Sequence, residues 1–288
     1  MSFLDRVRAC HGFSPDEFRR FVVAGEPVGW VLPGFAEALR PHGRVFAVTE
    51  AEVRLSDELR DFDARTRAVH GVLEELVRSK VLRKLRHEAY PVGTGWGREP
   101  LLTVDRAVVP PFGIEAYGIH VNGFVRARDG LKLWVGRRAK DKATAPGKLD
   151  HLVAGGHPHG ISLADNLVKE AQEEANIPEA LARKAMPVGA VSYRLRNEEG
   201  LRNDILFIYD LEVPEDVTPE NTDGEVEEFF LWPVERVMEV LRETDSFKFN
   251  VALVLVDFLI RHGFIGPEDP DYEALVHGRV RGWGEGGG

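Results

Sequence analysis

The sequence predicts a mixed α/β fold built in layers, preceded by a smaller N-terminal α+β domain. Residues 117–127 and 131–136 are apolar, β-rich runs joined through an Asp-Gly turn that favours a hairpin. Residues 162–175 place apolar side chains at helical spacing, and residues 251–260 are apolar enough for a buried closing helix. Strands before and after a central helix are typical of α/β layer structures.

Composition limits the class of protein. The 288 residues suffice for two ordinary domains, and 43% hydrophobic with 29% charged residues is typical of a soluble globular protein. The net charge of −10 argues against general nucleic-acid binding, and no apolar run would span a bilayer. The charged N-terminus does not resemble a secretory signal, so we expect a cytoplasmic protein. A single cysteine, Cys10, excludes an internal disulfide framework and a zinc ribbon.

The predicted N-terminal α+β domain covers residues 1–111. Residues 14–17 (Ser-Pro-Asp-Glu) have the form of a capping box with proline at the first helical position. After Asp61, apolar side chains recur at the spacing of an amphipathic helix, at Val69, Leu73, Leu76 and Val77. The pair Pro110-Pro111 marks the predicted boundary.

The second predicted domain covers residues 112–283, and residues 284–288 form a glycine-rich tail that we expect to be disordered. Further strands are predicted at residues 149–154, 188–195, 205–213 and 227–232. Residues 245–248 (Asp-Ser-Phe-Lys) begin the closing helix, where they either cap it or accept an anion.

The central helix follows a glycine-rich loop. Ser162 and Asp165 have the spacing of a capping box, and Asn176 can take the left-handed conformation that ends a helix. The buried stripe is predicted at Leu163, Leu167, Ala171 and Ala175.

Three glutamates, Glu170, Glu173 and Glu174, lie along one edge of this helix, where like charges repel. Hard divalent cations take oxygen ligands, so a bound cation would reverse this repulsion. Glycines 155 and 156 let the backbone approach a ligand closely. The alternative is that the three carboxylates are ordinary solvated charges.

The segment resembles a variant Nudix box, G-x5-E-x7-R-E-U-x-E-E-x-G-U, where U is a bulky aliphatic residue. Five residues match it without insertion: Gly155, Glu170, Glu173, Glu174 and Ile177. Four positions differ: Ile161 replaces the first glutamate, Lys169 the arginine, Ala171 the aliphatic residue and Asn176 the glycine.

Nearly the whole chain, and most specifically residues 117–265, is similar to a Nudix branch whose members carry an N-terminal domain of their own and are often described as related to thiamine pyrophosphokinase. The resemblance implies a Nudix α/β/α sandwich that hydrolyses a small-molecule diphosphate. Candidate substrates are thiamine diphosphate and its oxidised analogues, oxothiamine and oxythiamine diphosphates, which would give the monophosphate and phosphate. It also implies Mg²⁺ or Mn²⁺ bound by Glu170, Glu173 and Glu174, with Glu173 or Glu174 orienting or deprotonating the attacking water.

Other candidate residues have two interpretations each. Arg138 and Lys148 either clamp a diphosphate or are solvated, and for Lys140 and Lys142 we favour solvation. Of the acidic residues near Asp223-Gly224, we select Glu225 as a further ligand or base.

His120 and Asn122 share a strand face, as substrate contacts or as a buried hydrogen-bonding pair. His151, His157 and His159 form a poor tetrahedral zinc site, so we interpret them as loop polarity or substrate contacts. Trp30 and Trp96 either stack on a substrate ring or pack in a core.

Two further functions stay open at this point. One is hydrolysis of a nucleoside diphosphate linked to another group, such as ADP-ribose. The other is a non-catalytic Nudix module that binds a phosphorylated metabolite, suggested by the four departures from the box. The second domain has no cysteine, which argues against an isomerase of the isopentenyl type. The sequence does not determine the oligomeric state.

Overall fold

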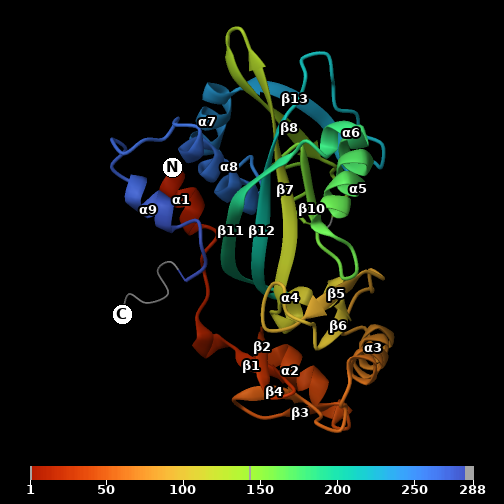
Figure 1. Ribbon diagram of the computed structural model, residues 1–288. Coiled ribbons are helices and arrows are strands. Elements are labelled where there is room, and N and C mark those ends of the chain that lie inside the picture. Colours follow the sequence, from red (N-terminus) through yellow and green to blue (C-terminus); the bar gives the residue numbers. More distant parts are fainter. Residues whose placement is uncertain (1, 143, 283–288) are drawn as a thin grey trace.

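The computed structural model describes residues 2–142 and 144–282, so the predicted disordered tail at 284–288 lies outside the described residues. A seven-stranded sheet lies between two groups of helices, and a smaller unit of strands and helices lies at one end of it (Figure 1). The predicted mixed α/β fold with a separate N-terminal part is confirmed. In the described ranges, no helix is long and apolar enough to cross a membrane.

The N-terminal part has its own hydrophobic core and two small sheets. The first sheet has the order β2-β1-β4-β3, with strands β1 (Arg19–Val23), β2 (Glu26–Val31), β3 (Phe46–Val48) and β4 (Glu52–Leu55). The second is the hairpin of β5 (Ala89–Val92) and β6 (Leu102–Asp105). The helices are α2 (Pro33–Leu39), α3 (Phe62–Arg78) and α4 (Val109–Phe112).

Helix α3 confirms the amphipathic helix predicted after Asp61. The Asp61 carboxylate accepts a hydrogen bond from the backbone N–H of Ala64, and Val69, Leu73 and Leu76 are buried. The capping box predicted at residues 14–17 is wrong. Residues Pro15–Glu17 form a single 3₁₀ turn and Ser14 makes no capping hydrogen bond, because the chain becomes extended at Phe18 and enters β1 directly.

The large sheet has the order β11-β12-β7-β8-β13, with β10 paired to β7 and β9 paired to β8. Its strands are β7 (Glu115–Ala127), β8 (Gly130–Arg138), β9 (Leu149–Asp150), β10 (Val153–Gly156), β11 (Met186–Asn197), β12 (Gly200–Glu212) and β13 (Val226–Pro233). The single strand predicted at residues 149–154 is therefore wrong. It is two strands with different partners, because β7 pairs with β8 only near their shared turn and leaves room for β10 further along.

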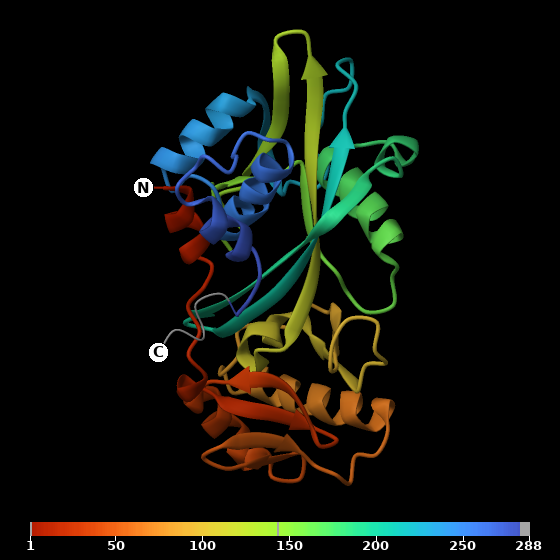
Figure 2. The ribbon, with the colours of Figure 1, turned by 60° about the vertical axis from the view of Figure 1, so that its left-hand side comes forward.

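Each face of the sheet is covered by a different group of helices, as Figure 2 shows from a second side. Helix α5 (Leu163–Ala175) packs on one face with Ile119 and Val121 of β7, and α6 (Glu179–Ala182) follows it. Helices α1 (Phe3–Arg8), α7 (Val234–Glu243), α8 (Phe249–Arg261) and α9 (Tyr272–His277) cover the other face. Helix α8 is the predicted buried closing helix. Its N-cap is Lys248 without a capping side chain, so the capping predicted for Asp245 or Ser246 is wrong.

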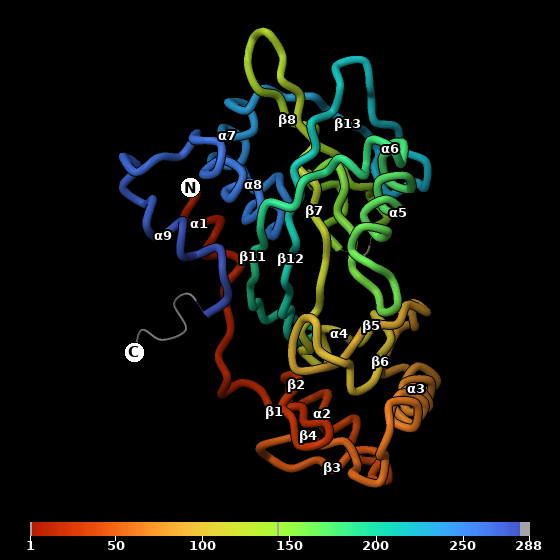
Figure 3. The backbone as a smooth tube through the Cα atoms, in the orientation of Figure 1, coloured from red at the N-terminus to blue at the C-terminus, as the bar shows by residue number. Residues whose placement is uncertain are grey.

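The first and last helices lie together although they are far apart in the sequence. Helix α1 packs in one core with α8 and α9, and the tube trace shows the N-terminal segment beside them (Figure 3). Cys10 is free and buried in the same core. The predicted division of the chain at residue 111 stays a prediction.

Candidate active site around the glycine loop

The glycine loop, residues 155–162, begins with the last two residues of β10 and leads into α5. Local residues fix both ends of this helix. The Ser162 hydroxyl accepts a hydrogen bond from the backbone N–H of Asp165 at 3.1 Å, as predicted for the N-terminal cap. Asn176 takes the left-handed conformation at φ 52° and ends the helix. Leu167, Ala171 and Ala175 are buried against the sheet, and the glutamates lie along the edge beside this stripe, where Glu174 is itself buried.

Glu170 lies against the glycine loop. A Cβ atom added to Gly155 would lie 2.5 Å from the Glu170 Cδ, so only glycine leaves space for this carboxylate. Burial raises the pKa of Glu170, although Lys169 opposes the shift through an ion pair at 3.2 Å. Lys169 also pairs with the half-exposed Glu173 at 3.3 Å, so one cation bridges two of the three predicted ligands.

Glu174 is the most buried of the three glutamates, with 7% of its surface exposed. Its carboxylate accepts a hydrogen bond of 2.9 Å from the backbone N–H of Ala154, in β10, and forms no ion pair with a described residue. Burial raises its pKa well above the ordinary value, and the charges of Glu170, Asp150 and Glu225 raise it further. Glu170, Glu225 and the ion-paired Asp150 therefore lie close enough to Glu174 for their charges to act on it.

Glu225 approaches this region through a loop that packs on the end of α5. The Thr222 hydroxyl donates to the carbonyl oxygens of Gln172 and Glu173, at 3.2 and 2.5 Å. Glu225 itself is half-exposed and pairs with Lys142 at 2.5 Å. The structure thus brings Glu225 toward the glutamates of α5, whereas Lys142, which we expected to be solvated, is held in an ion pair.

The two predicted diphosphate clamps are both engaged within the protein. Arg138 donates to the buried Asp150 carboxylate at 2.8 Å and to the carbonyl oxygen of Thr144. Lys148 donates to the carboxylate and the carbonyl oxygen of Asp245, which is largely exposed. Their role in substrate binding stays a prediction.

Asp150 is the centre of a buried charge cluster that sequence reasoning missed. Besides Arg138, it pairs at 3.5 Å with Lys248, the residue that begins α8. Burial alone would raise the pKa of Asp150, but Lys248 and Arg138 outweigh it and hold that pKa below the ordinary value. No local pattern marks this pairing, because it joins β9 to a helix far along the chain.

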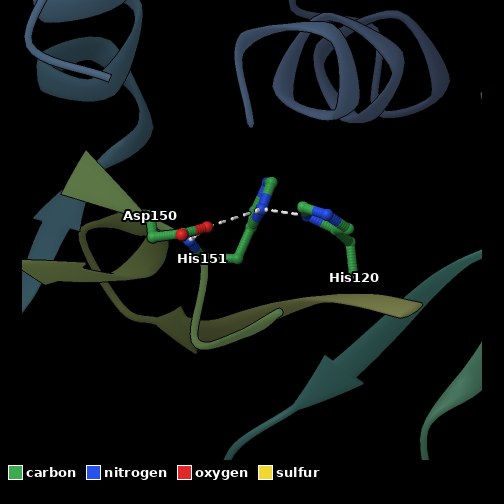
Figure 4. Close-up of side chains that lie close together, drawn as sticks. All are labelled: His120, Asp150 and His151. Carbon is green, nitrogen blue, oxygen red and sulfur yellow. Dashed lines mark hydrogen bonds and ion pairs between the residues drawn. The ribbon is translucent and has the colours of Figure 1, made fainter. Parts of the chain in front are cut away.

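His120 and His151 extend this cluster inward (Figure 4). Their Nδ1 atoms are 2.9 Å apart, so one imidazole donates to the other, and both side chains are buried. In the described ranges, the only set of three His, Cys, Asp or Glu side chains with ligand atoms all within 4.8 Å is these two histidines with Asp150. The glutamates of α5 are less tightly gathered. Since Asp150 already has two cationic partners, a third cation there would be repelled, and we interpret the set as a buried hydrogen-bonding network.

Asn122 is also internal, because its amide donates to Asp210 at 3.0 Å. Asp210 in turn pairs with Arg261 at 2.7 Å and with His262 at 2.9 Å. His120 and Asn122 therefore have the buried, hydrogen-bonded environment that was one of their two interpretations, and their contact with substrate stays a prediction.

The N-terminal part contacts the glycine loop directly. A Cβ atom on Gly156 would lie 1.9 Å from the Tyr90 hydroxyl oxygen, and the backbone N–H of His159 donates to the Ala89 carbonyl at 2.7 Å. Burial raises the pKa of Tyr90 to about 12, so its hydroxyl stays protonated. Tyr90 gave no signal in the sequence because its significance depends on docking of the two parts.

Each of the two parts of the chain matches a known protein family. Residues 2–116 match a family described as a domain of unknown function (DUF4743), and residues 116–252 match the NUDIX domain. The chain is 45% identical over 275 residues to Nudix hydrolase 24, chloroplastic, of Arabidopsis thaliana, covering 94% of this chain and 75% of that protein. It is 44% identical over 282 residues to Nudix hydrolase 20, chloroplastic, of the same plant, with the same coverage. An uncharacterized protein of Saccharomyces cerevisiae, YJR142W, is 34% identical over 249 residues, covering 80% of this chain and 72% of that protein.

The chain therefore belongs to the Nudix hydrolase family. This confirms the predicted superfamily, the Nudix α/β/α fold and the hydrolase class. The relation to thiamine pyrophosphokinase stays a prediction.

Proposed function

We propose that this Nudix hydrolase is a pyrophosphohydrolase that depends on a divalent cation held by Glu170, Glu173 and Glu174. The observation that carries the proposal is Glu174, a buried carboxylate that forms no ion pair with any described residue and has three further carboxylates close enough to raise its pKa. Burial favours the protonated form of such a carboxyl, and a hard cation with oxygen ligands would stabilise its charged form instead. The space that Gly155 leaves for Glu170 fits the same ligand set.

A bound Mg²⁺ or Mn²⁺ supplies charge neutralisation for a diphosphate and lowers the pKa of water. Glu174 is fixed by Ala154, whereas Glu173 is half-exposed and free to turn once its pairing with Lys169 is broken. Glu173 or Glu174 orients the attacking water or accepts its proton, and Glu225 is a further candidate for this base. The cations of Arg138 and Lys148 stabilise charge on the phosphoryl oxygens if substrate displaces their carboxylate partners.

The proposed substrate is thiamine diphosphate or one of its oxidised analogues, hydrolysed to the monophosphate and phosphate. This choice rests on the resemblance of residues 117–265. The second candidate is a nucleoside diphosphate linked to another group, such as ADP-ribose. Both have a ring attached to a diphosphate, so both are compatible with the cavity described in the next subsection.

A panel of diphosphates tests the reaction and the substrate. Phosphate release is measured with thiamine diphosphate, oxothiamine diphosphate and ADP-ribose, with Mg²⁺, Mn²⁺ or chelator. Because ADP-ribose yields two monophosphates, its products are treated with phosphatase before phosphate is measured. We expect phosphate release to depend on the cation and to be fastest with a thiamine compound. Faster turnover of ADP-ribose would reject the proposed substrate, and turnover unaffected by chelator would reject the metal.

Substitution of the glutamates tests the proposed roles. Glu173→Gln and Glu174→Gln should each reduce turnover about 100-fold or more, because loss of a metal contact affects affinity and activity together. Glu179→Gln is the matched control, since Glu179 is an exposed glutamate of α6 that pairs with Arg183. Unchanged turnover in the first two variants, with unchanged thermal unfolding, would contradict the assignment.

A further inference from the structure

A cavity of about 200 Å³ lies between the N-terminal part and the glycine loop. Its lining includes the glycine-rich turn around Trp96 and residues 157–161, which lead from β10 into α5. Tyr117 of β7 also lines it. The cavity is therefore formed only when the two parts of the chain are docked.

Trp96 presents an aromatic surface in this cavity. Its ring centroid lies 4.8 Å from that of Tyr117, 4.6 Å from that of Phe207 and 5.5 Å from that of His157. Despite these contacts, 47% of Trp96 is exposed, which makes it one of the few large apolar side chains at the surface. Trp30, in contrast, packs against Phe13 at 5.1 Å. An exposed indole beside a cavity is favourable when a ligand ring covers it.

His157 supplies a second, independent observation. It is 6% exposed and lines the cavity, yet its buried Nδ1 atom has no hydrogen-bond partner among the residues that the structure describes. Burial lowers its pKa, so the imidazole is neutral and each ring nitrogen either donates or accepts one hydrogen bond. A buried polar atom without a partner is unfavourable, so a turn of the imidazole that brings Nδ1 to the cavity would let a ligand with a polar ring atom or amino group satisfy it.

The cavity is close to the proposed catalytic carboxylates. His157 directly follows β10, and its backbone N–H still donates to the Tyr117 carbonyl of β7 at 2.8 Å, so the alternation of the strand continues to it. His157 and Gly155 therefore face the same side, and Gly155 is the residue against which Glu170 lies. Two extended residues span about 7 Å. This distance is comparable to the linker between a ring and the first phosphate of a substrate.

We propose that this cavity binds a planar nitrogen heterocycle carried by the diphosphate substrate, stacked on Trp96 and hydrogen-bonded by His157. The N-terminal part thereby determines which group the substrate carries, while α5 acts on the diphosphate. This inference rests on the proposed function, since it places the diphosphate of the same molecule at Glu170.

Binding of ring-bearing products tests the inference without requiring turnover. Calorimetric titration of the full chain with thiamine monophosphate and AMP is compared with titration with ribose 5-phosphate, which has no heterocycle. We expect at least one ring-bearing compound to bind more tightly than ribose 5-phosphate. Trp96→Ala should weaken that binding about tenfold, which is typical for loss of one stacking contact, while Trp96→Phe retains most of it.

His157→Ala should weaken the same binding, and neither substitution should change the affinity for ribose 5-phosphate. Met186→Ala is the control, since Met186 is 66% exposed on β11 and lies outside the cavity lining. The inference is overturned if no ring-bearing compound binds more tightly than ribose 5-phosphate. It is also overturned if Trp96→Ala and His157→Ala bind the ring-bearing compound as tightly as the unaltered chain does. If the unaltered chain hydrolyses no diphosphate but binds a ring-bearing compound that Trp96→Ala and His157→Ala bind more weakly, the cavity is supported and the proposed reaction is rejected. The failure of the cavity and the failure of the reaction are therefore distinguishable.

Discussion

The side chain of Glu170 lies against the backbone of Gly155: a Cβ atom at Gly155 would be 2.5 Å from the Cδ atom of Glu170. Because Gly155 lies in β10, hydrogen-bonded to β7, the backbone there cannot move away easily. Gly155 therefore determines where the carboxylate of Glu170 can lie.

Gly155→Ala should displace the Glu170 carboxylate and reduce turnover at least about tenfold, with a larger requirement for Mg²⁺. Activity is measured over a range of cation concentrations. Gly34→Ala serves as the control, since a Cβ there meets no atom within 4 Å. Equal cation requirements in both variants would show that the contact does not position Glu170.

Asp150→Asn should strongly destabilise the fold, because it leaves Arg138 and Lys248 without their buried partner. Removal of one partner from a buried ion cluster costs about 3–5 kcal/mol. Urea denaturation measures the loss. Asp245→Asn, which removes the exposed partner of Lys148, should have little effect, and a similar loss in both variants would contradict the distinction.

The sequence predicts helix α5 well because its determinants are local. Ser162 and Asn176 mark its two ends, and the apolar stripe fixes the face that is buried, so the edge beside it that carries the glutamates follows. The burial of Glu174 does not follow, because it depends on contact with Ala154 of β10. The hairpins of the large sheet are predicted for the same reason, since turn residues and β-rich runs are adjacent in the chain.

The remaining parts depend on contacts between distant residues. Lys248 meets Asp150, and Tyr90 meets Gly156, only after whole elements have packed together. The division of residues 149–154 into β9 and β10 likewise depends on which neighbour each strand finds, and alternation along the chain does not encode this choice.

The His120–His151 pair should make the fold sensitive to mild acid. Burial lowers the pKa of both residues, that of His151 to about 4, so the folded protein keeps them neutral. The unfolded chain takes up protons near pH 6.5, so the stabilisation is complete above this value and is lost as the pH falls toward about 4. Each histidine contributes a slope of up to about 1.4 kcal/mol per pH unit in that range.

His151→Asn removes one of these groups, so its unfolding temperature should fall less steeply between about pH 6.5 and 4.5. The slope is the relevant quantity, since the variant is also less stable at all pH values. His70→Asn, at an exposed position on α3, is the matched control and should keep the original slope. An unchanged slope in His151→Asn would show that the pair is not the acid-sensitive element.

Gly71 lies in the middle of α3, where a Cβ would meet no atom within 4 Å. Gly71→Ala should raise the free energy of unfolding by about 0.5–1 kcal/mol, because alanine loses less backbone entropy than glycine on helix formation. Gly25→Ala provides the opposite case, since Gly25 has φ +84° in the turn between β1 and β2 and a side chain there is strained. Urea denaturation should show a higher free energy of unfolding for Gly71→Ala and a lower one for Gly25→Ala. A lower value for Gly71→Ala would show that other residues pack closely against α3 at this position.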